Sequence, residues 1–351
     1  MAGNDARGRT IDAETELAAA LTTMVGRALP APITIEGMRR LSGGASRETW
    51  SFDALDATGA RHPLILRRDF TDGRTQSPDL IIGRKDALDR AGEYTLLRTL
   101  HAAGLPVPRP IAAPESGDAL ADCYLMERVD GETRPWVIIR AHEFDSVRPQ
   151  LVRQLAATLA RVHSFTATDL PFMPQRTLDD QLELIRRLLD HSGITRPALE
   201  AALRWCHDRL GAVAPANRPL RLVHGDFRTS NYAAGPEGLR AVFDWEFSHI
   251  GDPVTDLGYA CMRAWRFGAD DREFTGIGSR AEFFAAYEAA GGEPVDPDRV
   301  RFSEVLCNLV AAGVFLERTR AYLGGEDRGL EAAAIARRIA ELEYDLLHLL
   351  D

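Results

Sequence analysis

Hydrophobic and polar positions follow two different spacings along the chain, and the change falls near residue 130. Before this point, apolar residues form short runs or alternate with polar ones between turn signals, which is typical of β-strands. Beyond it, apolar residues recur with the period of an α-helix over long stretches. The pattern therefore predicts an α+β protein with a β-rich first part and a mainly helical second part.

The first part combines predicted strands with two predicted helices. An amphipathic pattern over residues 11–29 ends at Pro30, because proline cannot continue a helix. A second helical pattern covers residues 86–103 and stops at Gly104. Glycine and aspartate turn signals separate the apolar runs. The predicted strands are 33–35, 48–52, 64–66, 106–112 and 122–127.

The second part contains helical stripes interrupted by two apolar runs that are too short for helices. These runs, 220–223 and 239–243, lie on either side of a Gly-Pro-Glu-Gly turn at 235–238 and resemble a hairpin insertion. We expect three regions: an N-terminal helix at 1–32, a β lobe at 33–127 and a helical lobe at 128–351. The predicted helices are 147–163, 177–192, 197–212, 253–266, 280–290, 297–322 and 329–350.

Composition and charge narrow the function classes. The 351 residues are 45% hydrophobic and 27% charged with a net charge of −10, which disfavours a nucleic-acid partner because phosphate backbones bind basic surfaces. No apolar stretch approaches the roughly 20 residues of a membrane helix, and the first residues lack a signal-peptide core. The four cysteines form no C-x-x-C pair. We expect a soluble cytoplasmic protein, monomeric or homodimeric, with no nucleic-acid or membrane partner.

The most informative motif is His-Gly-Asp-Phe-Arg-Thr-Ser-Asn at 224–231, followed by Val-Phe-Asp-Trp-Glu at 242–246. Phosphoryl transfer needs a carboxylate that orients or deprotonates a hydroxyl, and oxygen ligands that hold Mg²⁺ on nucleotide phosphates. The separation of Asp226 and Asn231 equals that in the kinase catalytic loop H-R-D-L-x-x-x-N. We therefore predict Asp226 as the base, Asn231 and Asp244 as metal ligands, and His224 as a buried support of the loop.

These motifs resemble the aminoglycoside phosphotransferase-like family of small-molecule kinases. The resemblance runs from about residue 33 to residue 350, with the family's motifs in order, and includes Gly-Asp-Pro at 251–253 and Asp-Leu-Gly at 256–258. It implies a bilobal protein-kinase-like fold, in which a small antiparallel β lobe accompanies a larger helical lobe. It also implies ATP and Mg²⁺ as cofactors and a small-molecule hydroxyl acceptor as partner.

The resemblance also assigns the nucleotide site. The sequence around 41–46 is similar to the phosphate-covering loop, Leu-Ile-Leu-Arg at 64–67 to the third strand, and 124–131 to the hinge. Arg67 then takes the place of the phosphate-binding lysine, with Glu93 of the following helix as its partner, and the adenine meets the hinge backbone. The implied nucleotide-binding residues are Ser42, Gly43, Gly44, Ala45, Ser46, Arg67, Glu93, Met126, Glu127 and Arg128.

Arginine at position 67 matters because Lys85 is the only lysine among 42 Lys and Arg residues. The residues around Lys85 do not match a Walker A loop. An arginine on the third strand keeps the positive charge and binds phosphate with a fixed fork geometry. Arg68 remains an alternative, because a one-residue shift in register reverses the face of a strand. Both arginines would otherwise be solvated charges at a sheet edge.

The acceptor stays open between two classes. Acidic residues after position 265 suit the amines of an aminoglycoside, whereas the hinge and third strand look closer to the kinase domains of acyl-CoA dehydrogenase-linked proteins, which implies hydroxyacyl-CoA acceptors. A nucleotide-binding pseudokinase that acts as an interaction module is the alternative function. Asp252 and Asp256 are predicted to cap a helix rather than bind metal. The acidic residues that could meet the amines of an aminoglycoside are Asp270, Asp271, Glu273, Glu317 and Glu326. The arginines that could bind a CoA substrate are Arg318, Arg320 and Arg328.

Overall fold

The computed structural model describes residues 5–41, 47–69, 88–214, 218–326 and 329–351. The chain forms two compact units, with residues 1–77 and 89–129 in unit 1 and residues 78–88 and 130–351 in unit 2. The predicted phosphate-covering loop at 42–46 and Lys85 lie outside the described residues. Within the described part of the chain, no helix has the length and apolar character needed to cross a membrane.

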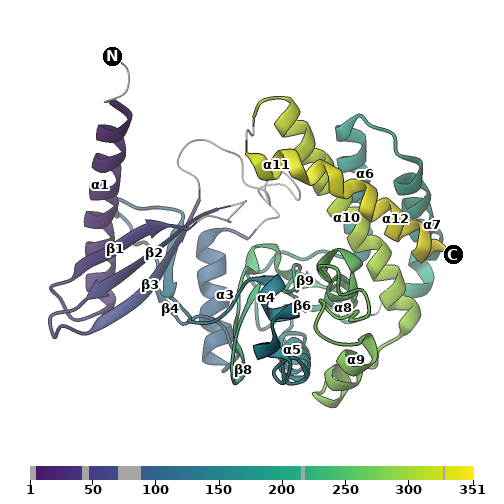
Figure 1. Ribbon diagram of the computed structural model, residues 1–351, viewed down its shortest axis with the longest axis horizontal. Coiled ribbons are helices and arrows are strands. Elements are labelled where there is room, and N and C mark those ends of the chain that lie inside the picture. Colours follow the sequence, from purple (N-terminus) through teal and green to yellow (C-terminus); the bar gives the residue numbers. More distant parts are fainter. Residues whose placement is uncertain (1–4, 42–46, 70–87, 215–217, 327–328) are drawn as a thin grey trace. The chain divides into compact units, whose positions relative to one another are not determined.

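Unit 1 is built on one antiparallel sheet in the order β1-β2-β3-β5-β4 (Figure 1). The predicted strands 48–52 and 64–66 lie within β2 and β3, whereas those at 33–35 and 122–127 each begin one residue before β1 and β5. The strands are β1 Thr34–Arg40, β2 Glu48–Leu55, β3 Arg61–Arg68, β4 Pro110–Ala112 and β5 Cys123–Glu127. The α+β class is confirmed.

The two faces of this sheet have different roles. One face carries Phe52, Leu66 and Leu125, all fully buried, and packs against the helix α1 Asp5–Ala28 in a shared hydrophobic core. Because neighbouring residues of a strand point to opposite faces, Arg67 lies on the other face. The helix α3 Arg90–Ala102 contacts β5 there through Tyr124, whose hydroxyl donates to a carboxylate of the helix. The sheet thus separates a hydrophobic core from a charged face.

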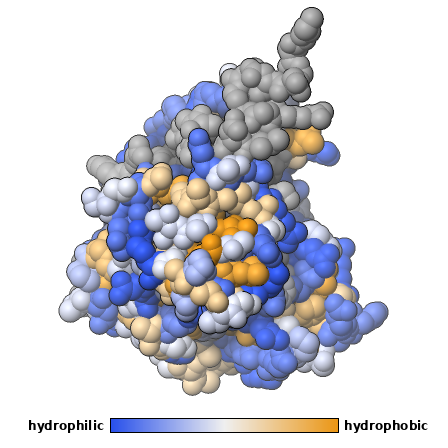
Figure 2. Space-filling view, turned by 90° about the vertical axis from the view of Figure 1, so that its left-hand side faces the viewer, coloured by the Kyte–Doolittle hydropathy of each residue, from blue (hydrophilic) through white to orange (hydrophobic). Residues whose placement is uncertain are grey.

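The surface view looks onto the side on which β1 and β2 lie in Figure 1. Hydrophobic side chains gather in one area of this face and hydrophilic ones surround them (Figure 2). Partly buried hydrophobic residues pack against the core of unit 1 at Leu29, Ile35, Met38, Ile111 and Leu120. Large hydrophobic side chains that are exposed belong almost entirely to unit 2, among the residues described.

Unit 2 contains two small antiparallel sheets among its helices, and here one sequence prediction is wrong. The run at 239–243 does pair across the turn, but its partner is β7 Tyr232–Gly235 rather than the run at 220–223. The earlier run forms β6 Arg221–Val223 and pairs with β9 His249–Gly251. β7 and β9 escaped prediction because alanine, glycine and histidine give no alternating apolar signal. The second strand of the hairpin is β8 Gly238–Val242.

The helices of unit 2 surround a long central one, α10 Pro297–Leu323, which contacts α6, α7, α8 and α12. Two predicted helices are shorter than expected. The helix predicted at 253–266 ends early because the chain becomes extended at Met262, and the one predicted at 329–350 is divided by a 3₁₀ turn at 336–338. The remaining bounds are α4 Pro135–Arg140, α5 Arg148–Val162, α6 Leu178–Ser192, α7 Pro197–Val213, α8 Val254–Cys261, α9 Arg280–Ala289, α11 Leu330–Ile335 and α12 Ile339–Leu350.

Candidate active site

The loop from His224 to Asn231 connects β6 to β7 and carries the predicted base. Gly225 has φ +84°, and a Cβ there would lie 2.6 Å from the carbonyl oxygen of Phe247. Only glycine meets both conditions, because other residues rarely adopt this backbone conformation and their Cβ would clash. The glycine therefore allows the loop to pass close to the segment that follows Asp244.

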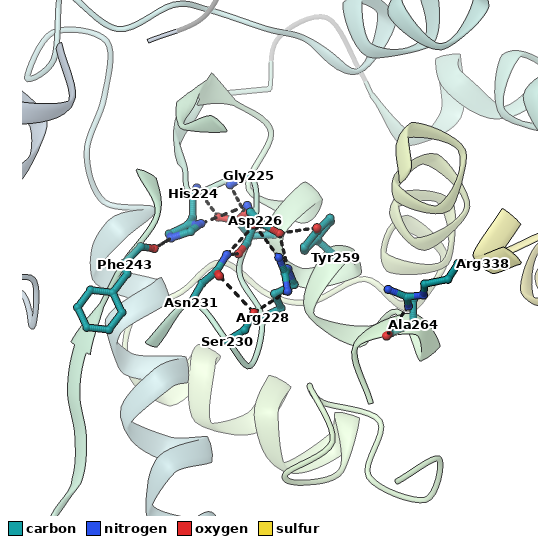
Figure 3. A network of polar contacts seen from close by, with 11 residues as sticks. His224, Gly225, Asp226, Arg228, Ser230, Asn231, Phe243, Tyr259, Ala264 and Arg338 are labelled. Carbon is teal, nitrogen blue, oxygen red and sulfur yellow. Dashed lines mark hydrogen bonds and ion pairs between the residues drawn. The ribbon is translucent and has the colours of Figure 1, made fainter. Parts of the chain in front are cut away.

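The carboxylate of Asp226 is held by three side chains (Figure 3). The amide Nδ2 of Asn231 donates to its Oδ2 at 2.6 Å, and Nε of Arg228 donates to its Oδ1 at 2.8 Å. The hydroxyl of Tyr259, from α8, donates to the same Oδ1. Charge-assisted hydrogen bonds of this kind are about twice as strong as neutral ones. A buried carboxylate is thus fixed in one orientation, as a positioned base requires.

Of the two predicted metal ligands, Asn231 contacts this carboxylate directly, and Asp244 follows a residue that pairs with Asn231. Because the amide nitrogen of Asn231 is used by Asp226, its Oδ1 is the atom that can coordinate a cation. The backbone N–H of Phe243 donates to the Asn231 carbonyl at 2.7 Å, which brings the next residue, Asp244, to the same loop. Asp244 has φ +65°, an uncommon conformation for a residue other than glycine and one that concentrates at functional sites.

This donor set suits Mg²⁺ rather than a metal held by protein alone. Among the residues that the structure describes, no group of three or more His, Cys, Asp or Glu side chains is arranged to hold a metal ion. Mg²⁺ is usually bound through one or two carboxylates together with substrate phosphates and water. One carboxylate and one amide oxygen therefore fit a cation that arrives with a nucleotide.

His224 is fully buried and supports the loop from behind. Its Nδ1 accepts the backbone N–H of Asp226 at 3.1 Å, so the ring proton is on Nε2, which donates to the carbonyl oxygen of Phe243 at 2.8 Å. The imidazole thus connects the segment of the base with the segment of Asp244. Both ring nitrogens are used by backbone groups, which supports the prediction of a structural histidine.

The side chain of Asp256, the third residue of α8, binds backbone groups of the same loop. Its carboxylate accepts the N–H groups of His224 and Gly225 at 2.7 and 2.9 Å and lies 3.1 Å from Nε2 of His163. Burial opposes the charged form, but His163 and the backbone donors outweigh it and lower the pKa of Asp256. Asp252 has no part in this arrangement, since its carboxylate accepts the backbone N–H of Val254, the first residue of α8, and pairs with Arg299.

Arg228 and Tyr259 were not predicted from the sequence. Burial opposes the charge on Arg228, but the adjacent Asp226 carboxylate outweighs it and raises the pKa of the guanidinium. Burial, together with the charge of Asp226, raises the pKa of the Tyr259 phenol well above its ordinary value, so the phenol remains a donor. Arg228 also lies 4.5 Å from the ring centre of Trp265. The only sequence signal was an arginine two residues after the predicted base.

In unit 1, Arg67 and Arg68 have different partners. Nε of Arg67 is 3.6 Å from Oε2 of Glu93, and its side chain is largely buried. Arg68 instead donates through Nε to Glu48 at 2.7 Å. The structure therefore brings the two residues of the predicted Arg67–Glu93 pair together and does not place either arginine as a solvated edge charge.

The hinge residues are engaged within the sheet. The backbone N–H groups of Glu127 and Arg128 donate to carbonyl oxygens of other strands or loops of unit 1, each at 2.9 Å. The guanidinium of Arg128 reaches Ser51 and Asp53. Met126 lies opposite Ile65 in the ladder between β3 and β5. An adenine contact with this segment would therefore have to use backbone groups other than these two N–H groups.

The acids proposed for an aminoglycoside are mostly paired with basic side chains. Arg263 binds Asp270, Arg280 lies near Glu273, and Arg320 binds both Glu317 and Glu326. Trp265 and Trp205 pack against other aromatic rings, whereas Tyr322 is partly exposed. Arg328 lies outside the described residues. The region after α8 is therefore a surface of mixed charge.

A separate open cavity of about 540 Å³ lies in unit 2. It does not include Asp226, Asn231 or Asp244. Its lining comes from the start of unit 2, the segment before α5 and the β7–β8 turn, and includes Glu132, Glu143, Phe144, Ala234 and Arg240.

The chain is similar in sequence to known proteins. The profile of the Phosphotransferase enzyme family matches residues 37–302. The mouse protein acyl-CoA dehydrogenase family member 10 is 26% identical over 281 residues, which cover 72% of this chain and 25% of that protein. The chain spans between a quarter and about a third of the length of such relatives from mouse and Pongo abelii.

Solved structures share the fold. A candidate aminoglycoside phosphotransferase from Ralstonia eutropha superposes with a TM-score of 0.72 at 20% identity, over 95% of this chain and 97% of that one. The aminoglycoside phosphotransferase APH(4)-Ia, solved as a thermostable mutant with AMP-PNP and hygromycin B, gives a TM-score of 0.60 at 17% identity, over 96% and 98% of the two chains.

Proposed function

The chain belongs to the phosphotransferase enzyme family, and from this premise we propose that it is an ATP-dependent kinase that phosphorylates a hydroxyl group of a small molecule. The observation that carries the proposal is the fixed carboxylate of Asp226, held by Asn231, Arg228 and Tyr259. A carboxylate in this setting can accept a proton but cannot move away from an acceptor hydroxyl. Positioning and charge neutralisation supply most of the rate in such reactions.

In the proposed reaction the acceptor oxygen forms a bond to the γ-phosphorus while the bond to the β–γ bridging oxygen breaks, and ADP leaves. The proton of the acceptor hydroxyl passes to the Asp226 carboxylate. Asn231 and Asp244 would hold Mg²⁺, which when bound neutralises charge on the nucleotide phosphates. Arg228 adds a fixed positive charge beside the carboxylate. Within unit 1, Arg67, which lies near Glu93, would contact nucleotide phosphates.

We propose a hydroxyl acceptor that is not a polycation. An aminoglycoside carries several amines and needs acids that are available to them, whereas Asp270, Glu317 and Glu326 already pair with arginines. The similarity to acyl-CoA dehydrogenase family members supports a hydroxyacyl-CoA acceptor instead. The similarity to solved aminoglycoside phosphotransferase structures is one of fold, but the chain is also 27% identical over 228 residues to the aminoglycoside 3'-phosphotransferase of Streptomyces fradiae, so aminoglycosides belong in the acceptor panel.

The test is phosphate transfer from ATP to a panel of aminoglycosides, sugars, amino alcohols and hydroxyacyl-CoA esters, by wild type and Asp226→Asn. Loss of a general base costs about 10²–10⁴-fold in turnover. We expect this loss in the variant, with nucleotide affinity unchanged. Turnover retained by Asp226→Asn would refute the assignment of the base. Nucleotide binding with no transfer to any acceptor would favour a pseudokinase, for which arginine at position 67 is the motivating feature.

A further inference from the structure

Unit 1 contains a buried cluster of charged residues, only two of which, Arg67 and Glu93, have a role in the proposed reaction. We call it the arginine–carboxylate cluster, and it consists of Arg47, Arg67, Asp69, Arg90 and Glu93. Arg47, Arg90 and Glu93 are each less than 5% exposed. Burying so many ionised groups costs free energy unless each is held by the others. Such an arrangement therefore calls for a role beyond packing.

The two oxygens of the Glu93 carboxylate have different partners. Oε1 lies 2.5 Å from Nη1 of Arg90, the residue three positions earlier on the same helix. Oε2 accepts the hydroxyl of Tyr124 at 2.9 Å and lies 3.6 Å from Nε of Arg67. The close ion pair of Glu93 is thus the one within α3, and the arginine of the third strand stands farther away.

The position of Arg90 is unfavourable by itself. It is the first residue of α3, directly after the N-cap Asp89, and the positive end of the helix dipole repels a cation there. It is also only 2% exposed, although arginine is seldom buried at this level. Burial opposes its charge, but the Glu93 carboxylate outweighs this effect and raises the pKa of Arg90. The contacts with Glu93 and with Asp69, at 3.1 Å, compensate for these costs.

We propose that Arg90 is a positioning residue for nucleotide binding, which fixes Glu93 so that Arg67 can direct its guanidinium to the nucleotide phosphates. This inference rests on the proposed function. In kinases one lysine both pairs with the helix acid and binds the phosphates. In this chain the two tasks are divided, with Arg90 as the ion-pair partner of Glu93 and Arg67 as the phosphate ligand. Without Arg90, Arg67 would pair with both oxygens of Glu93 in the bidentate manner that arginine prefers.

The experiment measures the affinities of the full-length chain for Mg-ATP and for adenosine, by isothermal titration, in Arg90→Met, Arg67→Met and the double variant. We expect Arg90→Met to weaken ATP about tenfold while adenosine is unchanged, since only the phosphate contact is lost. In the Arg67→Met background it should cause no further loss, because coupled residues are not additive. Arg90→Lys, which keeps the charge, should recover most of the affinity and guards against a variant that fails to fold.

Arg299→Met is the matched control, because Arg299 is also a buried arginine that pairs with an acid but lies in unit 2. It should lower the melting temperature without changing the ratio of ATP to adenosine affinity. The inference is wrong if Arg90→Met binds ATP as wild type does, if it weakens ATP and adenosine equally, or if the double variant shows additive losses. Because no turnover is needed, a chain that binds ATP but transfers no phosphate still tests Arg90 while it refutes the proposed function.

Discussion

Replacing Asp256 by asparagine should separate the support of the active-site loop from general stability. Asp256 is fully buried, and its carboxylate accepts two backbone N–H groups from the loop and faces His163. Asparagine has almost the same shape, but it loses the charge and turns an NH₂ group towards one of these donors. Breaking a buried charged arrangement of this kind costs about 3–5 kcal/mol of unfolding free energy.

The effect on turnover follows from the position of the loop. The two N–H groups that Asp256 binds belong to the residues directly before Asp226, so the backbone that carries the base would shift. A displacement of about 1 Å in a catalytic group costs about 10²-fold in rate. We therefore expect Asp256→Asn to lower both the unfolding free energy, measured by urea denaturation, and kcat, measured at a temperature at which the variant remains folded.

Asp252→Asn is the matched control for this prediction. Asp252 lies four residues earlier, is also buried, and pairs with Arg299, away from the loop. Its loss should destabilise the protein by a similar amount, because Arg299 would keep a buried charge without its acid, but kcat of the folded protein should stay near wild type. Equal kcat in Asp256→Asn and Asp252→Asn would show that the loop does not depend on the Asp256 carboxylate.

Two further predictions concern single hydrogen bonds and pH. Tyr259→Phe removes one hydrogen-bond donor to the Asp226 carboxylate, worth about 1.5–3 kcal/mol, so kcat should fall about tenfold or more. Steady-state assays should show an unchanged KM for ATP. The control Tyr344→Phe, at an exposed tyrosine, should keep the kcat of the wild type. Burial, with the nearby charge of Arg176, lowers the pKa of His249 to about 3, so the folded protein keeps this ring neutral while the unfolded chain takes up a proton below pH 6.5. Stability is therefore lost as pH falls from 6.5 towards 3, by about 2 kcal/mol at pH 5, and urea denaturation of His249→Asn should show a smaller loss; an unchanged pH dependence would contradict this.

Long periodic segments and the order of the motifs could be predicted from the sequence. The helix predicted over 297–322 matches α10 closely, because proline at its first position and glycine directly after its last residue mark both ends. The pairing of the short strands could not be predicted, since β7 and β9 together contain few branched apolar residues. What decides their pairing is the path of the loops between them, which includes turns with positive φ at Gly225 and Asp244.

The active site shows the same division between local and long-range information. The spacing of Asp226 and Asn231 is local, and the structure places these two side chains in direct contact. Tyr259 lies in a helix 33 residues beyond Asp226, and nothing in its immediate sequence marks it as a partner of the carboxylate. The pairing of Arg90 with Glu93, by contrast, follows from local sequence, because residues three positions apart on a helix are neighbours.

The scarcity of lysine gives the arrangement around Glu93 a physical reason. A lysine ammonium is a compact charge whose three donors can turn towards a carboxylate and a phosphate at once, whereas the donors of a guanidinium lie in one plane with fixed directions. An arginine that satisfies a carboxylate with both arms therefore turns away from a phosphate. A second arginine on the adjacent helix, Arg90, removes this conflict. It pairs with Oε1 of Glu93 at 2.5 Å, so that Arg67 can interact with only the other carboxylate oxygen. Replacing the strand lysine by arginine thus favours a companion arginine near the helix acid, and Arg90 occupies that place.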